Sequence, residues 1–488
     1  MSTSAILAWL DEIPNDCRAD TTQPLACKRR RLNPPTPDSS TISYDKDIAF
    51  LDMPTSRKAS PHKRQEPGGA ETPRSKRFRS DIDLEPSEVS ATSGRLSPSK
   101  QLRALRHQPD GIEYRELSDF DNKPASLRSL LKSIDTVMEG QGIVASSHQP
   151  ALLQAAEDDG DVFDWAASGA SYYFSDGRNQ FGQTPSVENV LRILDKAIQC
   201  SQGDHHEDAW NNFVHTPLLE LAFHPTGQRI KHQFITAASC THASILPDYG
   251  NPSATKKVDF CIYVNPSNES RASAVINPPA VLAIDRLCHE LPCNVFNFTE
   301  FVPLERQPIA LSIETKKPGE GWEGARLQLG VWQMAHWCFL SYLIELQEAK
   351  REARREQATK DAREAREAEA QQEAGVILER GDMQHSAQSL SLREKQPGTS
   401  PLEAVDKSRS PFRLPEFLPG IIIQGHQWDL VITTLDGTKT KFWHKLPMGN
   451  TLDTKGIYKL VYSLQILRSW VEKSYWPWLK ELILDHRE

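Results

Sequence analysis

One triplet of residues places a carboxylate and an ammonium on a stretch with the pattern of a buried strand. In IALSIETK, Glu314 and Lys316 lie two residues apart, and the apolar positions alternate with them at Ile309, Leu311 and Ile313. Side chains two apart on a β-strand share a face, so this strand directs both charges to one side. Charges in an apolar element cost free energy unless they are paired or bind a cation.

Acid-x-Lys triplets are common, and three others in this chain begin at Asp121, Glu348 and Asp453. The first and third lie beside turn or loop sequence, and the second lies on a highly charged helical stretch. Only the triplet at Glu314 lies on an alternating strand. Taken alone, this triplet favours a structural salt bridge between Glu314 and Lys316, and that interpretation stays open here.

A second carboxylate, Asp259, occupies the same kind of position on VDFCIYV, opposite the apolar face of that stretch. If the two strands are neighbours, Asp259 and Glu314 converge and Lys316 lies beside them. Carboxylate oxygens suit Mg²⁺ or Mn²⁺, and such a cation neutralises a phosphate and lowers the pKa of a bound water. A nearby lysine can orient the water or stabilise developing negative charge. The pattern therefore predicts a metal site for phosphodiester cleavage.

Two more side chains are candidates for this site. Glu207 begins a helix expected over residues 207–223, where it could add a third carboxylate through water or serve a second metal. Gln328 and Trp332 lie four residues apart on the helix that follows the triplet, so they share a face. The Gln328 amide could position the lysine or a nucleotide. Pro217 is expected to kink the earlier helix.

The elements that must hold these residues follow from the hydrophobic pattern. Helical spacing predicts helices over residues 127–138, 187–198, 207–223 and 323–344 and from about 454. Alternation predicts strands over residues 258–264, 309–316, 421–423, 428–435 and 438–445, the last two joined by a hairpin turn at Asp436-Gly437.

Composition indicates that only part of the 488 residues is packed, because apolar residues make up 38%, below the roughly 45–50% of a globular chain. Residues 1–109 are expected to be a disordered basic tail, and residues 110–344 the first part of the folded domain. Residues 345–412 form a charged helical and Ser/Pro-rich insertion: sixteen of residues 345–374 are charged and eight are alanine. Residues 413–488 complete the domain.

Charge is distributed unevenly. The net charge is −8, so a nucleic-acid-binding surface must be local. Residues 21–80 carry thirteen Lys/Arg against six Asp/Glu, and Lys28–Arg31 is a short basic run typical of a nuclear import signal, with a solvated or phosphate-binding tail as the alternative. We expect a nuclear location, otherwise a cytoplasmic one, with an import receptor as partner.

The eight cysteines are scattered without a CxxC pair, which favours reduced, mostly buried thiols. A zinc site is the alternative, with the candidate ligands Cys240, His242, Cys288, His289 and Cys293. The N-terminal stretch lacks the pattern of a signal peptide, and no segment has the length of a membrane span, so no membrane association is expected.

Several stretches together resemble the PD-(D/E)XK nuclease superfamily, and more closely the fungal PD-(D/E)XK nuclease-like domain proteins. They are EDAWN, VHTPLL, VDFCIYV, the block around SIETKKP, LPGIIIQGHQW and KLPMGNTLDTKGIYKLV, spanning about residues 185–480. The resemblance implies an α/β, restriction-endonuclease-like mixed β-sheet flanked by helices.

The same resemblance implies roles for single residues. Asp259 takes the "D" position, Glu314 and Lys316 the "(D/E)XK" positions, and Glu207 that of the early-helix acid. Gln328 with Trp332 resembles the Gln-x-x-x-Tyr element of bacterial recombination exonucleases. Val258 stands in place of the motif's proline and Trp332 in place of tyrosine, so a hydroxyl is absent there.

The leading hypothesis is a Mg²⁺- or Mn²⁺-dependent nuclease acting on nucleic acid, with DNA favoured as the substrate. The alternative is a catalytically inactive fold of the same kind that binds nucleic acid or a protein, using the charged helix and the basic tail. A third hypothesis, a scaffold with no nucleic-acid role, is suggested by the net negative charge.

Overall fold

The computed structural model describes residues 97–168, 170–224, 229, 232–250, 256–269, 279–319, 321–381 and 412–484. These residues belong to one compact unit that spans Ser90–Glu488. The basic run Lys28–Arg31 lies outside the described residues, as do the Ser/Pro-rich residues 382–411, so the expectations for both stay predictions.

A seven-stranded mixed sheet forms the centre of the described unit, in the order β1-β9-β8-β7-β6-β5-β4. The β1/β9 and β6/β7 pairs are parallel and the other pairs are antiparallel. The strands are β1 (Ile112–Glu116), β4 (Ile235–Ser239), β5 (Phe260–Val264), β6 (Ile309–Lys316), β7 (Leu418–Gln424), β8 (Gln427–Asp436) and β9 (Lys439–Asn450), and β2 (Val144–Ala145) and β3 (Phe174–Ser175) form a separate parallel pair.

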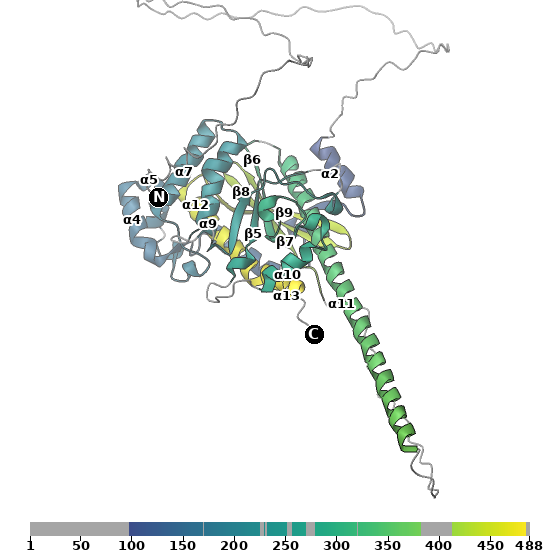
Figure 1. The fold of residues 1–488 in the computed structure, drawn as a ribbon. Helices are drawn as coiled ribbons and strands as arrows, with labels where there is room; N and C mark the ends of the chain where they lie inside the picture. The colour runs from purple at the N-terminus through teal and green to yellow at the C-terminus, as the bar shows by residue number, and fades with distance from the viewer. Residues whose placement is uncertain are drawn as a thin grey trace, which may run out of the picture. The chain divides into compact units, whose positions relative to one another are not determined.

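Helices cover both faces of the large sheet (Figure 1). One face packs against α11 (Trp322–Gly381), and the other packs against α12 (Thr454–Trp470) together with α3 (Ala125–Glu139) and α9 (Thr216–Phe223). The remaining helices are α2 (Pro98–His107), α4 (Gln149–Asp158), α5 (Gly160–Ser168), α6 (Ala170–Tyr173), α7 (Val187–Gln202), α8 (Glu207–Trp210), α10 (Pro279–Cys288) and α13 (Trp476–Leu484). This architecture confirms the predicted restriction-endonuclease-like α/β fold.

Local chemistry explains where several elements begin and end. The Asp453 side chain accepts a hydrogen bond from the backbone of Gly456 and caps α12. Gly437 turns the chain between β8 and β9 with a φ of 60°, a left-handed conformation that glycine adopts without strain. β6 is buried over seven of its eight residues, because β5 and β7 flank it and helices cover both faces.

The segment from Glu207 to Phe223 is helical throughout, but its middle is a π-helical turn, η4 (Asn211–His215). Pro217 lies in the first turn of α9, directly after it. Proline has no N–H and crowds the carbonyl of the residue four positions earlier. The irregularity expected at Pro217 is therefore found one turn earlier, as a widened turn.

One boundary differs from that predicted. α2 lies within residues 1–109, for which no packed structure was expected, and Leu102 anchors it in the core. The domain therefore begins before residue 110. The charged stretch after residue 344 was expected to be helical, and it continues the helix predicted over residues 323–344 as α11, whose residues 352–372 are exposed. Figure 1 shows this part extending away from the sheet.

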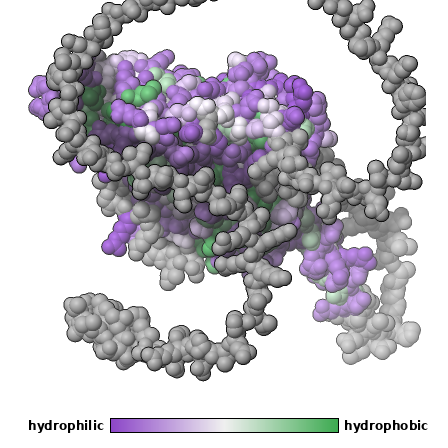
Figure 2. Space-filling model, turned by 90° about the horizontal axis from the view of Figure 1, so that it is seen from above, coloured by the Kyte–Doolittle hydropathy of each residue, from purple (hydrophilic) through white to green (hydrophobic). Residues whose placement is uncertain are grey.

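Figure 2 shows a mostly hydrophilic face, on which hydrophobic residues form small separate patches. No helix among the described residues has the length and apolar content needed to cross a membrane. The cysteines of the described ranges are free thiols, of which Cys200, Cys240, Cys261 and Cys288 are buried and Cys293 and Cys338 are exposed.

The buried histidine His336 of α11 makes stability depend on pH. Tyr475 donates its hydroxyl hydrogen to the carbonyl of Ile309 at 2.8 Å, so its oxygen accepts from His336 Nε2 at 3.1 Å. Nδ1 is then left without a hydrogen-bond partner among the described residues. Burial lowers the pKa of His336 to about 3, whereas an unfolded histidine has a pKa of about 6.5.

Between these two pKa values the unfolded chain binds a proton that the folded chain does not, so the free energy of unfolding falls as pH falls from about 6.5 towards 3. His336→Gln, which keeps an N–H donor towards Tyr475, is expected to reduce this loss by about 1.4 kcal/mol per pH unit. Urea denaturation at pH 6.5, 5.5 and 4.5 measures the difference. An equal slope in both proteins would contradict the assignment.

Candidate functional site

The pairing of β5 with β6 brings Asp259 close to Glu314. Phe260 pairs with Ile313 in the antiparallel ladder, and Asp259 directly precedes β5. The backbone N–H of Asp259 donates at 3.0 Å to the carbonyl of Ile313, the ladder partner of Phe260, so the chain leaves the regular ladder at Asp259. The two strands are therefore neighbours, as the sequence hypothesis required.

Glu314 is fully buried and Lys316 nearly so, with 13% of the lysine side chain exposed. The lysine Nζ lies 2.6 Å from Glu314 Oε1 and 3.3 Å from Glu207 Oε2, and it donates to the carbonyl of Thr315 at 2.7 Å. Oε2 of Glu314 has no hydrogen-bond partner among the described residues. One oxygen of a buried carboxylate thus stays unsatisfied beside an ion pair.

Asp259, which is 8% exposed, is held by two elements. Its Oδ2 accepts from the backbone N–H of Thr315 at 2.8 Å and from the Thr315 hydroxyl at 3.0 Å. Its Oδ1 has one long contact, with Asn211 Nδ2 at 3.5 Å. Oδ2 therefore accepts two hydrogen bonds of ordinary length, whereas Oδ1 can still accept a further hydrogen bond or bind a cation.

Burial and mutual repulsion dominate the electrostatics of these groups. Burial raises the pKa of Glu314 well above its ordinary value, and the Asp259 carboxylate raises it further against the opposing effect of Lys316. Burial also raises the pKa of Asp259, offset in part by the Thr315 N–H and by Lys316. Burial lowers the pKa of Lys316, but Glu314, Glu207 and Asp259 raise it by more. The carboxylates are thus destabilised as anions, and an added cation would relieve this.

The donor set fits a hard divalent cation. The oxygens with spare capacity, Glu314 Oε2 and Asp259 Oδ1, are both carboxylate oxygens. No group of three or more His, Cys, Asp or Glu side chains with metal-ligand geometry occurs among the described residues. A Mg²⁺ site commonly uses one or two carboxylates and completes its shell with water and substrate phosphate, so two carboxylates suffice. A cluster for zinc would need more ligands.

The remaining predicted residues lie around this pair. Glu207 of α8 contacts the lysine, and among the described residues it forms no three-member group of metal-ligating side chains with the two carboxylates, so its predicted role at the metal stays a prediction. Gln328 of α11 donates to the carbonyl of Lys257 at 3.3 Å, two residues before Asp259. Trp332 donates to the hydroxyl of Ser312 at 3.0 Å, two residues before Glu314. The Gln-x-x-x-Trp pair therefore ties α11 to the segment before β5 and to β6, and its described contacts do not include Lys316.

The three other acid-x-Lys triplets serve structural roles or lie in turns. Asp453 caps α12, and Lys455 donates to the hydroxyl of Tyr173 at 2.8 Å. Lys350 pairs with Glu290 on the surface. Lys123 donates to the carbonyl of Phe120 at 2.7 Å. Placement on a buried strand thus distinguishes the triplet at Glu314 from the others.

The family model of the PD-(D/E)XK nuclease superfamily matches residues 151–476, about two thirds of the chain. The chain belongs to the PD-(D/E)XK nuclease superfamily. The matched region contains Glu207, Asp259, Glu314 and Lys316, so the resemblance read from the sequence is confirmed for the family. No curated protein and no solved structure gives a match.

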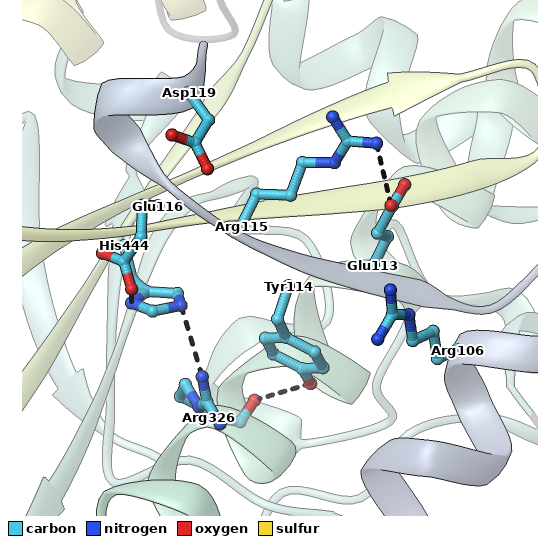
Figure 3. Close-up of a pocket in the computed structure, with 8 residues that line it drawn as sticks. All are labelled: Arg106, Glu113, Tyr114, Arg115, Glu116, Asp119, Arg326 and His444. Atoms are coloured by element: carbon cyan, nitrogen blue, oxygen red, sulfur yellow. Dashed lines mark hydrogen bonds and ion pairs between the residues drawn. The ribbon is translucent and has the colours of Figure 1, made fainter.

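A separate pocket of about 490 Å³ opens between α2, β1, β9 and α11, lined by Arg106, Glu113, Tyr114, Arg115, Glu116, Asp119, Arg326 and His444 (Figure 3). Arg115 lies 2.9 Å from Glu113, and the His444 ring lies between Glu116 and Arg326. Burial lowers the pKa of His444. Three arginines are balanced by three acids, and no predicted site residue lines the pocket, so it forms no part of the carboxylate site.

Sequence reasoning missed two residues that contact Asp259. Thr315 acts largely through its backbone N–H, which leaves no signal in residue types. Asn211 lies four residues after Glu207, and a helical spacing of four from a candidate acid was a signal that the sequence offered.

Proposed function

We propose that this chain is a divalent-metal-dependent nuclease that hydrolyses phosphodiester bonds in nucleic acid, with DNA as the favoured substrate. The observation that supports it most is the buried Glu314, close to Asp259 and paired with Lys316 at 2.6 Å, whose Oε2 has no hydrogen-bond partner among the described residues. Buried polar atoms normally have a hydrogen-bond partner, and a structural salt bridge alone would not explain why one oxygen of this buried carboxylate lacks one. Membership of a nuclease superfamily supports the same reaction class.

Glu314 and Asp259 would hold Mg²⁺ or Mn²⁺, which supplies Lewis acidity towards a phosphate and lowers the pKa of a water. Thr315 orients Asp259 through two hydrogen bonds, so Oδ1 keeps a fixed direction. Lys316 is protonated, because Glu314, Glu207 and Asp259 together raise its pKa. It can therefore donate a hydrogen bond to a phosphate oxygen or water and stabilise developing negative charge. Glu207 keeps the ammonium in place from the side of α8.

Asp259→Asn tests this proposal, with Asp429→Asn as its matched control. Asp429 of β8 is another buried aspartate, and it pairs with Lys445 at 3.4 Å. With supercoiled plasmid or single-stranded DNA and Mg²⁺ or Mn²⁺, Asp259→Asn is expected to lower the cleavage rate by about a thousandfold, since metal assistance supplies several kcal/mol. Asp429→Asn is expected to retain cleavage.

Cleavage that persists in chelator, or in Asp259→Asn, would contradict the proposal. Absence of divalent-dependent cleavage on DNA and on RNA by the wild-type protein would also contradict it. DNA binding that survives both chelation and Asp259→Asn, without cleavage, would favour the alternative of a nucleic-acid-binding module.

A further inference from the structure

A line of hydrogen bonds leads from a buried histidine to the candidate metal ligand Asp259. His215 Nδ1 lies 2.8 Å from Asn211 Oδ1, and Asn211 Nδ2 lies 3.5 Å from Asp259 Oδ1. An amide oxygen and a carboxylate oxygen both accept hydrogen bonds, so the direction is fixed. His215 donates through Nδ1–H, and Asn211 donates through its amide N–H. The imidazole therefore sets which end of the Asn211 amide faces Asp259.

The packing around His215 holds its imidazole in a fixed orientation towards Asn211. Its side chain is fully buried, with its ring perpendicular to Trp428 at 5.5 Å and tilted against Trp210 at 6.0 Å. Burial lowers the pKa of His215 to about 3, against a smaller raising effect of the Gly425 backbone, so the ring is neutral near neutral pH. A neutral ring has one N–H, and the contact with Asn211 fixes it on Nδ1. The tautomer is thus set by the surroundings.

The π-helical turn begins at Asn211 and ends at His215, the two residues of this network. Single π-helical turns are rare and occur often at functional sites. Glu207, one helical turn earlier, contacts Lys316, so three residues spaced four apart serve the site from one helical segment. Glu207 holds the lysine, and Asn211 holds the aspartate.

We propose that Asn211 and His215 are positioning residues that fix the metal-facing oxygen of Asp259. The inference rests on the proposed function, because it assumes that Asp259 binds a divalent cation. Thr315 already satisfies Oδ2, so Oδ1 is the oxygen with capacity for a cation, and Asn211 is its described hydrogen-bond donor. Groups that orient metal ligands in this way commonly change metal affinity 10–100-fold when they are removed.

The test is Mn²⁺ affinity of the full chain, measured by isothermal titration calorimetry without nucleic acid, with urea denaturation of each variant in parallel. Asn211→Ala and His215→Leu are each expected to weaken Mn²⁺ binding about tenfold. His215→Asn keeps an amide N–H near the position of Nδ1 and is expected to restore most of the affinity. Should His215→Leu fail to fold, Asn211→Ala carries the test, because it leaves the buried ring in place.

His336→Leu is the matched control, because His336 is also fully buried and its described contacts are with Tyr475 and Phe298, away from Asp259. It is expected to lose stability but keep Mn²⁺ affinity. Unchanged affinity in Asn211→Ala, no recovery in His215→Asn, or an equal loss in His336→Leu would each overturn the positioning role. A wild-type protein that binds no Mn²⁺ would overturn the metal centre itself, so the two failures are distinguishable.

Discussion

Lys316→Met is expected to lower cleavage at least a hundredfold and to reduce the free energy of unfolding by about 3–5 kcal/mol. The lysine is the ion-pair partner of Glu314, whose side chain is fully buried. Removing one partner of a buried pair leaves the other charge uncompensated, which is the costly case. Methionine keeps the length and apolar stem of the side chain, so packing changes little.

The same variant separates the lysine from the metal ligands. A positive charge beside a cation is repulsive, so Lys316→Met is expected to keep or increase Mn²⁺ affinity while cleavage is lost. Urea denaturation, calorimetry and a plasmid-cleavage assay measure the three quantities. Lys445→Met is the matched control: it also pairs with a buried carboxylate, that of Asp429, but 44% of its side chain is exposed. Retained cleavage in Lys316→Met would contradict the role of the lysine.

Glu314→Gln is expected to stabilise the protein, whereas Lys316→Met destabilises it. Glu314→Gln is also expected to lower the cleavage rate by a larger factor. Burial and the neighbouring Asp259 raise the pKa of Glu314, which means that its anion is destabilised in the metal-free protein. Glutamine is nearly isosteric and uncharged, and Lys316 still has Glu207 at 3.3 Å. The free energy of unfolding is expected to rise by about 1 kcal/mol, within the range of mutations that relieve strain at functional sites.

Function is lost in Glu314→Gln because an amide oxygen is a much weaker ligand for a hard cation than a carboxylate. Cleavage is expected to fall at least a thousandfold, and Mn²⁺ affinity is expected to fall with it. The double variant Glu314→Gln/Lys316→Met completes a cycle: it should recover most of the stability lost in Lys316→Met, without cleavage. A Glu314→Gln protein that is as unstable as Lys316→Met, yet still binds Mn²⁺, would mean that the pair is structural.

The strands that carry the site were predictable because their patterns are strong. Residues 309–316 alternate cleanly and form β6 with the same bounds, and VDFCIYV contains β5. Other elements were missed for physical reasons. β1 (IEYRE) and β4 (ITAAS) are short edge strands without a continuous apolar face, and their pairing depends on distant partners. The helix α2 was also missed, because its sequence offers one residue, Leu102, that is buried in the core.

Within the site, the residue types predicted which charged groups take part, but they did not predict what the side chains contact. Asp259 and Glu314 come close because β5 pairs with β6, which the sequence permits but does not specify. Gln328 has the expected place on α11, but its amide contacts the carbonyl of Lys257. Side-chain amides find whichever backbone group is within reach, and only the packed structure determines that choice.

The central claim is that Asp259 and Glu314 share one divalent cation. Anomalous diffraction from Mn²⁺-soaked crystals tests it most directly. We predict one strong anomalous peak at about 2.0–2.5 Å from an oxygen of each carboxylate, on the side of Asp259 Oδ1 and Glu314 Oε2. Clear density for both side chains with no peak between them, at a Mn²⁺ concentration that supports cleavage in solution, would contradict the account.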